Sequence, residues 1–238
     1  MKTELKYLDN TYLLEDTSRV LDIQEDENGK YCVLDSTIFY PQGGGQATDI
    51  GKISIGSANI GIHFVAFING VVRHYGEFND VSIIGEEAIS YVDEETRMLN
   101  AKSHTAGHLV SSVVEGMDNL IGVKGYHFLN GSYIEFEGTK PEDIENFIIK
   151  ANETLKSEVQ SNTDISTKIV TKEELYTLCK NVPEFLPTDK PIRIMTFQNF
   201  EPIPCGGTHL NTLKDLENVT ITKIKSKKGR VKASYTFA

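Results

Sequence analysis

The chain has no tryptophan, three cysteines and seven prolines among 238 residues, and it has no long apolar run. A membrane-spanning helix, which needs about 20 consecutive apolar residues, is therefore not expected. The charged residues in segment 2–16 argue against a signal peptide or an amino-terminal anchor. Three widely spaced cysteines do not form a disulfide framework, and reduced thiols are typical of the cytoplasm. We expect a cytoplasmic globular protein.

The net charge of −10 argues against indiscriminate binding of nucleic acid, because such binding depends on lysine and arginine neutralising phosphates. One segment departs from this acidic character. Residues 223–232 hold only basic charges, and this basic stripe consists of Lys223, Lys225, Lys227, Lys228, Arg230 and Lys232. The stripe is either the solvated face of a hairpin or a contact for RNA phosphates.

The first 90 residues have the character of short strands. Segments 12–23, 31–39 and 51–55 are rich in β-branched and aromatic residues, and segments 62–68 and 71–75 flank Asn69-Gly70, a two-residue hairpin signal. Strands at this spacing predict a small closed or half-closed β-barrel.

The hydrophobic period changes at Asp93, which is a good N-cap for a helix that reaches residues 118–119. Its expected buried residues are Leu99, Ala106, Leu109, Val110, Val113, Val114 and Met117. A hairpin over Asn130-Gly131 follows, and then a second helix with Pro141 at its first position. Later segments predict strands at 165–170, 191–197, 219–226 and 230–237 and a short helix at 172–179. The pattern predicts an α+β protein with a β-barrel-like domain over 1–92 and, over 93–238, layers of antiparallel sheet and two longer helices.

Two pairs of ligand-type residues lie about a hundred positions apart. His104 and His108 are four residues apart on the predicted helix and therefore share one face. Cys205 and His209 flank Gly206-Gly207-Thr208 and follow two prolines, which indicates a tight irregular loop. Either pair alone is a weak signal, but together they offer the nitrogen and sulfur ligands that zinc prefers. The sequence predicts one Zn²⁺ ion, held by the fold instead of by a local finger.

The role of this metal stays open at the level of sequence. Four protein ligands normally close a zinc site, whereas a hydrolytic site keeps a position for water. No general base can be identified, and the HExxH signature of zinc proteases is absent.

A glycine-rich segment precedes the helix, with Gly43, Gly44 and Gly45 followed by Gln46. Consecutive glycines allow the backbone to approach another group closely, and the glutamine amide offers both donors and an acceptor. A phosphate-binding loop is disfavoured because the lysine and helix of such a loop do not follow. A sharp turn or bulge is the plain structural alternative.

The motifs HTAGH and CGGTH, preceded by PQGGGQATDIG, resemble the editing domain shared by alanyl-tRNA synthetase and the free-standing AlaX proteins. The segment Lys124-Gly125-Tyr126-His127-Phe128 also resembles AlaX proteins, and the similarity covers nearly the whole chain. No segment resembles the active-site domain of a class II synthetase. The length and the glycine-rich segment match the medium-length AlaX form.

This resemblance implies a zinc-dependent hydrolase that cleaves the ester of mischarged alanine tRNA, chiefly its seryl form, with the glycyl form as a second candidate. It implies that His104, His108, Cys205 and His209 bind the zinc, and that Gly43, Gly44, Gly45 and Gln46 border the amino-acid pocket. A pocket that accepts alanine cannot strongly exclude serine or glycine, so a second site must remove them after transfer. Gln46 and Thr208 are candidates for contacts with the serine hydroxyl.

Three positions near these motifs raise further expectations. Gly107 stands where synthetase editing domains often have threonine, and its missing side chain is expected to widen the pocket. Arg97 is a candidate for a tRNA phosphate, with an intrahelical salt bridge as the alternative. Further candidates for tRNA contact are Lys225, Lys227, Lys228 and Arg230. His127 either packs or supports the metal ligands, and Cys32 and Cys179 are expected to be buried.

Two other functions compete with the tRNA hydrolase. A non-catalytic, zinc-stabilised tRNA-binding module would have the same ligands without turnover. A zinc hydrolase of small molecules would not need the basic stripe.

Overall fold

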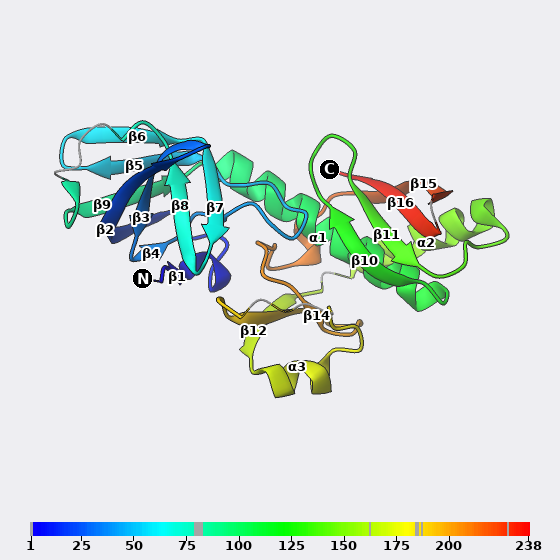
Figure 1. Cartoon of the computed structure of the whole chain (residues 1–238). Helices are drawn as coiled ribbons and strands as arrows, with labels where there is room; N and C mark the ends of the chain where they lie inside the picture. The colour runs from blue at the N-terminus through cyan, green and yellow to red at the C-terminus, as the bar shows by residue number, and fades with distance from the viewer. Residues whose placement is uncertain (1, 79–82, 162, 184–185, 187, 228) are drawn as a thin grey trace. The chain divides into compact units, whose positions relative to one another are not determined.

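The computed structural model describes the chain except for residues 1, 79–82, 162, 184–185, 187 and 228, together with the side chain of Lys227 (Figure 1). The chain divides into two compact units. The first contains residues 1–43 and 47–99, and the second contains residues 44–46 and 100–238. Among the described residues, no helix combines the length and the apolar character that a membrane crossing requires.

The first unit contains a seven-stranded sheet in the order β6-β5-β9-β2-β3-β8-β7, in which all pairs are antiparallel. Its strands are β2 (Glu15–Asp26), β3 (Gly29–Leu34), β5 (Gly51–Ile55), β6 (Ala58–Ile62), β7 (Phe64–Ile68), β8 (Val71–Tyr75) and β9 (Glu87–Val92). Two short strands, β1 (Glu4–Leu5) and β4 (Ser36–Thr37), pair in parallel. The core of this unit includes Val20, Leu34, Phe39, Ile53 and Val65.

The long strand β2 connects the two parts of this sheet. Its first half pairs with β9 and its second half with β3, and the ladder with β3 shifts register between Val20 and Asp22. A bulge of this kind bends a strand and increases its twist. The ladders within the described residues leave β6 and β7 as unpaired edges. The predicted strand-rich region is therefore present, but the described pairing forms an open sheet and not a closed barrel.

The predicted Asn69-Gly70 hairpin is confirmed. Ile68 of β7 pairs with Val71 of β8, and the two residues between them have φ of 51° and 82°. Both lie in the left-handed region that a two-residue turn of this type requires.

The helix α1 (Glu94–Met117) begins in the first unit and continues in the second. The carboxylate of Asp93 accepts a hydrogen bond from Thr96 N at 2.8 Å, which confirms the predicted cap. The predicted apolar face is buried at Ala106, Leu109, Val110, Val113 and Val114. The expectation for Leu99 was wrong, because 36% of this residue is exposed.

The second unit contains an antiparallel sheet in the order β10-β11-β16-β15. Its strands are β10 (Ile121–Tyr126), β11 (Tyr133–Glu137), β15 (Val219–Lys227) and β16 (Arg230–Phe237). Helix α2 (Ile144–Gln160) packs on β15, and Asn152 exchanges two hydrogen bonds with the backbone of Ile221, where the β15–β16 register shifts. These elements agree with the predicted layers, and the α+β class is confirmed.

The start of α2 differs from the prediction. Asp143 is the N-cap, and its carboxylate accepts a hydrogen bond from Asn146 N at 3.0 Å. Pro141 therefore lies before the helix and not at its first position. The Asp143 carboxylate pairs with an N–H of the first turn that has no partner within the helix, and this cap determines where α2 begins.

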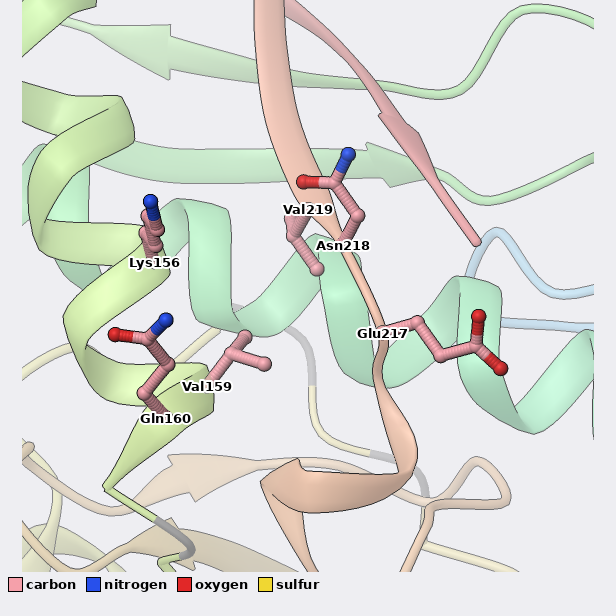
Figure 2. A pocket seen from close by; sticks show the side chains of 6 residues that line it. All are labelled: Lys156, Val159, Gln160, Glu217, Asn218 and Val219. Atoms are coloured by element: carbon pink, nitrogen blue, oxygen red, sulfur yellow. The ribbon is translucent and has the colours of Figure 1, made fainter.

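A smaller sheet completes the second unit. Its order is β12 (Ile165–Val170), β13 (Ile192–Phe197) and β14 (Ile203–Pro204), and it packs against α3 (Lys172–Leu178). β14 leads directly into the CGGTH loop. A separate hollow of about 400 Å³ lies beside the end of α2 and the start of β15 (Figure 2). It is lined by Lys156, Val159, Gln160, Glu217, Asn218 and Val219, and none of these belongs to the predicted site.

Candidate metal centre

The two predicted ligand pairs converge in the second unit. The ligand atoms of His104, His108, Cys205 and His209 all lie within 4.8 Å of one another. Nε2 of His104 lies 3.0 Å from Nε2 of His108 and 3.6 Å from Sγ of Cys205, and Sγ lies 3.0 Å from Nε2 of His209. Tetrahedral coordination at zinc bond lengths of roughly 2.0–2.3 Å separates ligand atoms by roughly 3.3–3.8 Å. The observed separations bracket this range, so the four ligand atoms lie close enough to share a single ion.

Two of the imidazoles are oriented by hydrogen bonds at their other nitrogen. Nδ1 of His104 lies 2.6 Å from the side-chain oxygen of Gln46, and Nδ1 of His209 lies 3.2 Å from the hydroxyl of Thr105. When Nδ1 donates in each case, Nε2 keeps its lone pair for a metal. The side chains thus fix the tautomer that a ligand needs.

The CGGTH loop is held by hydrogen bonds from the neighbouring strand β13 and within the loop itself. The guanidinium of Arg193 in β13 donates to the carbonyl oxygens of Cys205 and Gly207, and Gly207 N donates to Sγ of Cys205 at 3.3 Å. Gly207 has to be glycine, because a Cβ atom there would lie 2.1 Å from Nδ1 of His104. The predicted irregular loop is confirmed.

The ionisation of the cluster favours metal binding. Burial lowers the pKa of His104 and His209 well below the usual value. Burial alone raises the pKa of the Cys205 thiol, but the adjacent His104 and His108 outweigh it and bring this pKa well below its usual value. Neutral imidazole and thiolate are the forms that bind metals.

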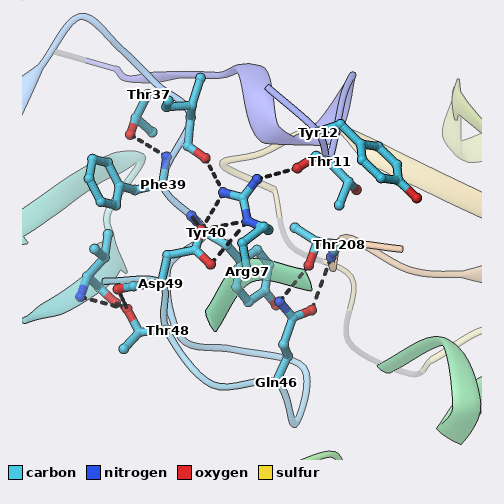
Figure 3. Close-up of polar contacts among 12 residues, drawn as sticks. Thr11, Tyr12, Thr37, Phe39, Tyr40, Gln46, Thr48, Asp49, Arg97 and Thr208 are labelled. Atoms are coloured by element: carbon cyan, nitrogen blue, oxygen red, sulfur yellow. Dashed lines mark hydrogen bonds and ion pairs between the residues drawn. The ribbon is translucent and has the colours of Figure 1, made fainter. Parts of the chain in front are cut away.

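Gln46 and Thr208 are both fully buried and bind each other (Figure 3). The Gln46 amide donates to the Thr208 hydroxyl at 2.8 Å, and its oxygen accepts from Thr208 N at 3.0 Å. Gly44 and Gly45, which precede Gln46, have φ of 55° and 81°, so the expected turn is present. Sequence reasoning missed that Gln46 orients His104. Direct contact of Gln46 or Thr208 with a substrate stays a prediction.

The expectation that Gly107 widens a pocket was wrong. A Cβ atom at Gly107 would lie 2.3 Å from Nδ1 of His127 and 2.6 Å from the hydroxyl oxygen of Tyr235. The space beside Gly107 is therefore already filled by a histidine. His127 is 3% exposed, and its ring centroid lies 4.6 Å from that of His104. Burial and the nearby His108 and His209 lower the pKa of His127 to about 3.

The prediction that Arg97 contacts a tRNA phosphate was also wrong. In the first unit its side chain is completely buried against the equally buried carboxylate of Asp49 (Figure 3). The guanidinium also donates to the carbonyl oxygens of Thr11 and Ile38. The intrahelical salt bridge considered as an alternative is wrong too, since Asp49 lies in the loop before β5.

The described residues of the basic stripe have different surroundings: some are exposed lysines, and Arg230 lies beside two acids. Lys223 and Lys225 are exposed on β15, and their proximity lowers the pKa of Lys225. Arg230 instead lies 3.4 Å from Glu135 and 3.8 Å from Glu137, acids on β11 that the linear stripe does not reveal. Lys228 and the side chain of Lys227 lie outside the described residues.

Comparisons with known proteins agree with the motifs. Residues 3–96 match the family described as tRNA synthetases class II (A), although we expected no segment to resemble the active-site domain of a class II synthetase. The chain is 26% identical to the alanyl-tRNA editing protein AlaX-M of Methanosarcina barkeri over 232 residues, which covers 94% of each protein. It is 28% identical to AlaX-L of Pyrococcus horikoshii over 94% of the chain, but it spans only 55% of that protein.

A third relative is the alanine–tRNA ligase of Methanobrevibacter smithii, which is 26% identical over 93% of the chain; the chain spans 25% of this ligase. The predicted resemblance is therefore confirmed, and the chain is similar over nearly its whole length to AlaX-type alanyl-tRNA editing proteins, with an extent that fits the AlaX-M form.

Proposed function

We propose that this protein is a hydrolase that removes a wrong amino acid from alanine tRNA, with one zinc ion held by His104, His108, Cys205 and His209. The convergence of three imidazole nitrogens and one thiol within 4.8 Å is the observation that carries the proposal. The names of the relatives, alanyl-tRNA editing proteins and alanine–tRNA ligase, support the substrate class.

The donor set suits zinc on chemical grounds. Zinc takes nitrogen and sulfur ligands in four-coordinate sites, and hydrogen bonds at the second nitrogen of a ligating histidine orient its ring. Gln46 and Thr105 provide such bonds. When bound, zinc supplies Lewis-acid character that polarises an ester carbonyl. The chain itself orients the ligands and keeps the cysteine ionised.

The physical need for such an enzyme lies in the size of the amino acids. Serine differs from alanine by one hydroxyl and glycine by one missing methyl, and a binding pocket for alanine discriminates weakly against both. A second site that hydrogen-bonds the serine hydroxyl would release serine and spare alanine. We propose seryl-charged alanine tRNA as the main substrate and the glycyl form as the second.

The test is to incubate zinc-loaded protein with alanine tRNA charged with alanine, serine or glycine, and to follow the release of each amino acid. Serine is expected to be released fastest and alanine slowest. Cys205→Ala, which removes one ligand, should lose both zinc and turnover, whereas Cys179→Ala is the matched control because Cys179 is a buried cysteine outside the cluster.

A non-catalytic zinc-stabilised tRNA-binding module is the second candidate, because four protein ligands resemble a closed structural site. Seryl-tRNA that survives incubation with fully zinc-loaded protein would overturn the hydrolase proposal in favour of this module.

A further inference from the structure

The imidazole of His127 occupies a slot made by three glycines from different segments of the second unit. Cβ atoms at Gly107 of α1 and Gly125 of β10 would lie 2.3 Å and 2.2 Å from the nearest atoms of the ring, and one at Gly45 would lie 3.2 Å away. Any larger residue at the first two positions would displace the ring. The glycines therefore make room for this side chain beside the metal cluster.

The backbone of His127 is fixed at both ends. Its N–H donates to the carbonyl oxygen of Gly45 at 2.8 Å, and its carbonyl oxygen accepts from the hydroxyl of Ser103 at 2.6 Å. Ser103 is the residue before the ligand His104. The ring centroid of His127 lies 4.6 Å from that of His104 and 5.9 Å from that of His108. His127 is thus attached to the same helical turn as the metal ligands.

The hydrogen bonds of Tyr235 determine which nitrogen of His127 carries the proton. The Tyr235 hydroxyl donates to the carbonyl oxygen of Ser103 at 3.0 Å and lies 2.7 Å from Nδ1 of His127. A hydroxyl has one proton, so with that proton on the Ser103 carbonyl the tyrosine oxygen accepts from Nδ1–H of the neutral imidazole. Nε2 then keeps a lone pair and acts as an acceptor.

Nε2 of His127 has no hydrogen-bond partner within the described part of the chain. Gly125, two residues earlier on β10, lies beside Nε2, and a Cβ atom there would be only 2.2 Å from it. Although His127 is only 3% exposed, Nε2 is not one of the fully buried side-chain atoms that lack a partner, so this acceptor remains accessible to a donor from outside the chain.

We propose that His127 determines specificity, with Nε2 accepting the hydrogen bond of the serine hydroxyl in the aminoacyl group. This inference rests on the proposed function, because it assumes that the ester is held beside the metal cluster. An alanyl group lacks this donor and leaves Nε2 unpaired, and a glycyl group lacks it as well. His127, which follows β10, fills the space that a side chain at position 107 would need.

The test compares His127→Phe, which keeps a ring in the slot but removes Nε2, with His127→Gln, whose amide oxygen can take the position of the acceptor. In His127→Phe, kcat/KM for seryl-tRNA should fall roughly tenfold, the value of one hydrogen bond to substrate, while that for glycyl-tRNA stays unchanged. His127→Gln should restore part of the serine preference. Zinc content should equal that of the parent protein in both variants.

A binding measurement separates this inference from the proposed function. Calorimetry with non-hydrolysable seryl and alanyl amides of 3′-amino-adenosine should show a preference for the seryl amide in the parent protein and none in His127→Phe. An unchanged preference in a fully zinc-loaded His127→Phe protein would overturn the role of His127. Failure of the parent protein to release any amino acid would instead overturn the proposed function.

If His127→Phe does not fold, Tyr235→Phe provides the second test. It removes the hydroxyl that holds Nδ1 and leaves the imidazole itself in place. The preference for the seryl amide should weaken without loss of zinc. An unchanged preference there would also count against the proposal.

Discussion

The side-chain oxygen of Gln46 accepts a hydrogen bond from Nδ1 of His104 at 2.6 Å, across 58 positions of sequence. Both residues belong to the second unit, although the rest of the glycine-rich segment up to Gly43 belongs to the first. Residues 44–46, which belong to the second unit, therefore contribute the Gln46 side chain that orients the candidate ligand His104.

Replacement of Gln46 by alanine should weaken metal binding. The loss of a hydrogen bond to a ligating histidine typically lowers metal affinity about 10–100-fold. Zinc affinity measured by competition with a chromophoric chelator provides the readout, and the exposed Gln42 offers a matched Gln42→Ala control. Equal affinities in the two variants would show that Gln46 does not support His104.

The buried Arg97–Asp49 pair should be sensitive to removal of one partner. Arg97→Met leaves a carboxylate with no exposure and no counter-charge, and we expect a loss of about 3–5 kcal/mol in the free energy of unfolding. Urea denaturation measures this loss. The partly exposed Lys6–Asp16 pair is the control, and Lys6→Met should cost less than about 1 kcal/mol. A cost for Arg97→Met as small as that of the control would contradict the prediction.

His74 should make the protein less stable in acid. Burial lowers its pKa from 6.5 to about 4, and its two ring nitrogens contact the hydroxyl of Thr37 and the carbonyl oxygen of Cys32. Between these pH values the unfolded chain binds the proton and the folded chain does not, so stability falls as pH drops from 6.5 to 4. The full effect is about 3 kcal/mol.

Urea denaturation between about pH 4 and pH 7 tests this prediction. In His74→Gln the dependence of stability on pH should be shallower over this window, whatever the absolute stability of the variant. Parallel curves for the two proteins would exclude His74 as the source.

The exposed lysines of β15 should contribute to tRNA binding if the proposed substrate is correct. Replacement of Lys223 and Lys225 by glutamine should weaken affinity and reduce the salt slope by roughly one for each lysine that neutralises a phosphate. Zinc content should stay constant. Lys168→Gln, an exposed lysine on β12 beside Glu174, is the control. An unchanged salt slope would favour a zinc hydrolase of small molecules or another path for the RNA.

Much of the local structure could be predicted because its signals are local. The Asn69-Gly70 turn, the Asp93 cap and the apolar face of α1 each depend on residues close to one another along the chain. The strand β9 was missed because it pairs with β2 and β5, which are distant in the sequence. The edge strand β6 pairs locally with β5, but it buries only Ile60 and Ile62 and so has a weak apolar pattern. The start of α2 was predicted wrongly from Pro141. The Asp143 cap, which is also a local sequence signal, determines where the helix begins.

The candidate ligands could be named because two pairs, each a weak signal alone, together offer the nitrogen and sulfur ligands that zinc prefers. Their surroundings could not be predicted. Nothing near Gly107 in the sequence indicates that His127, on a later segment, fills the space, and nothing near Arg97 indicates that Asp49 neutralises it. Contacts of this kind form only in the tertiary fold, and the separation of two residues along the sequence does not indicate that their side chains will meet.

Arg193 has a consequence for how the CGGTH loop responds to change. One guanidinium secures the carbonyl groups on both sides of Gly206, and it does so from β13, a strand that supplies no ligand. The positions of the Cys205 thiol and the His209 imidazole therefore depend on the same side chain, Arg193. Loss of the Arg193 guanidinium would free Cys205 and His209 at the same time. Metal should therefore be lost in one cooperative step and not ligand by ligand.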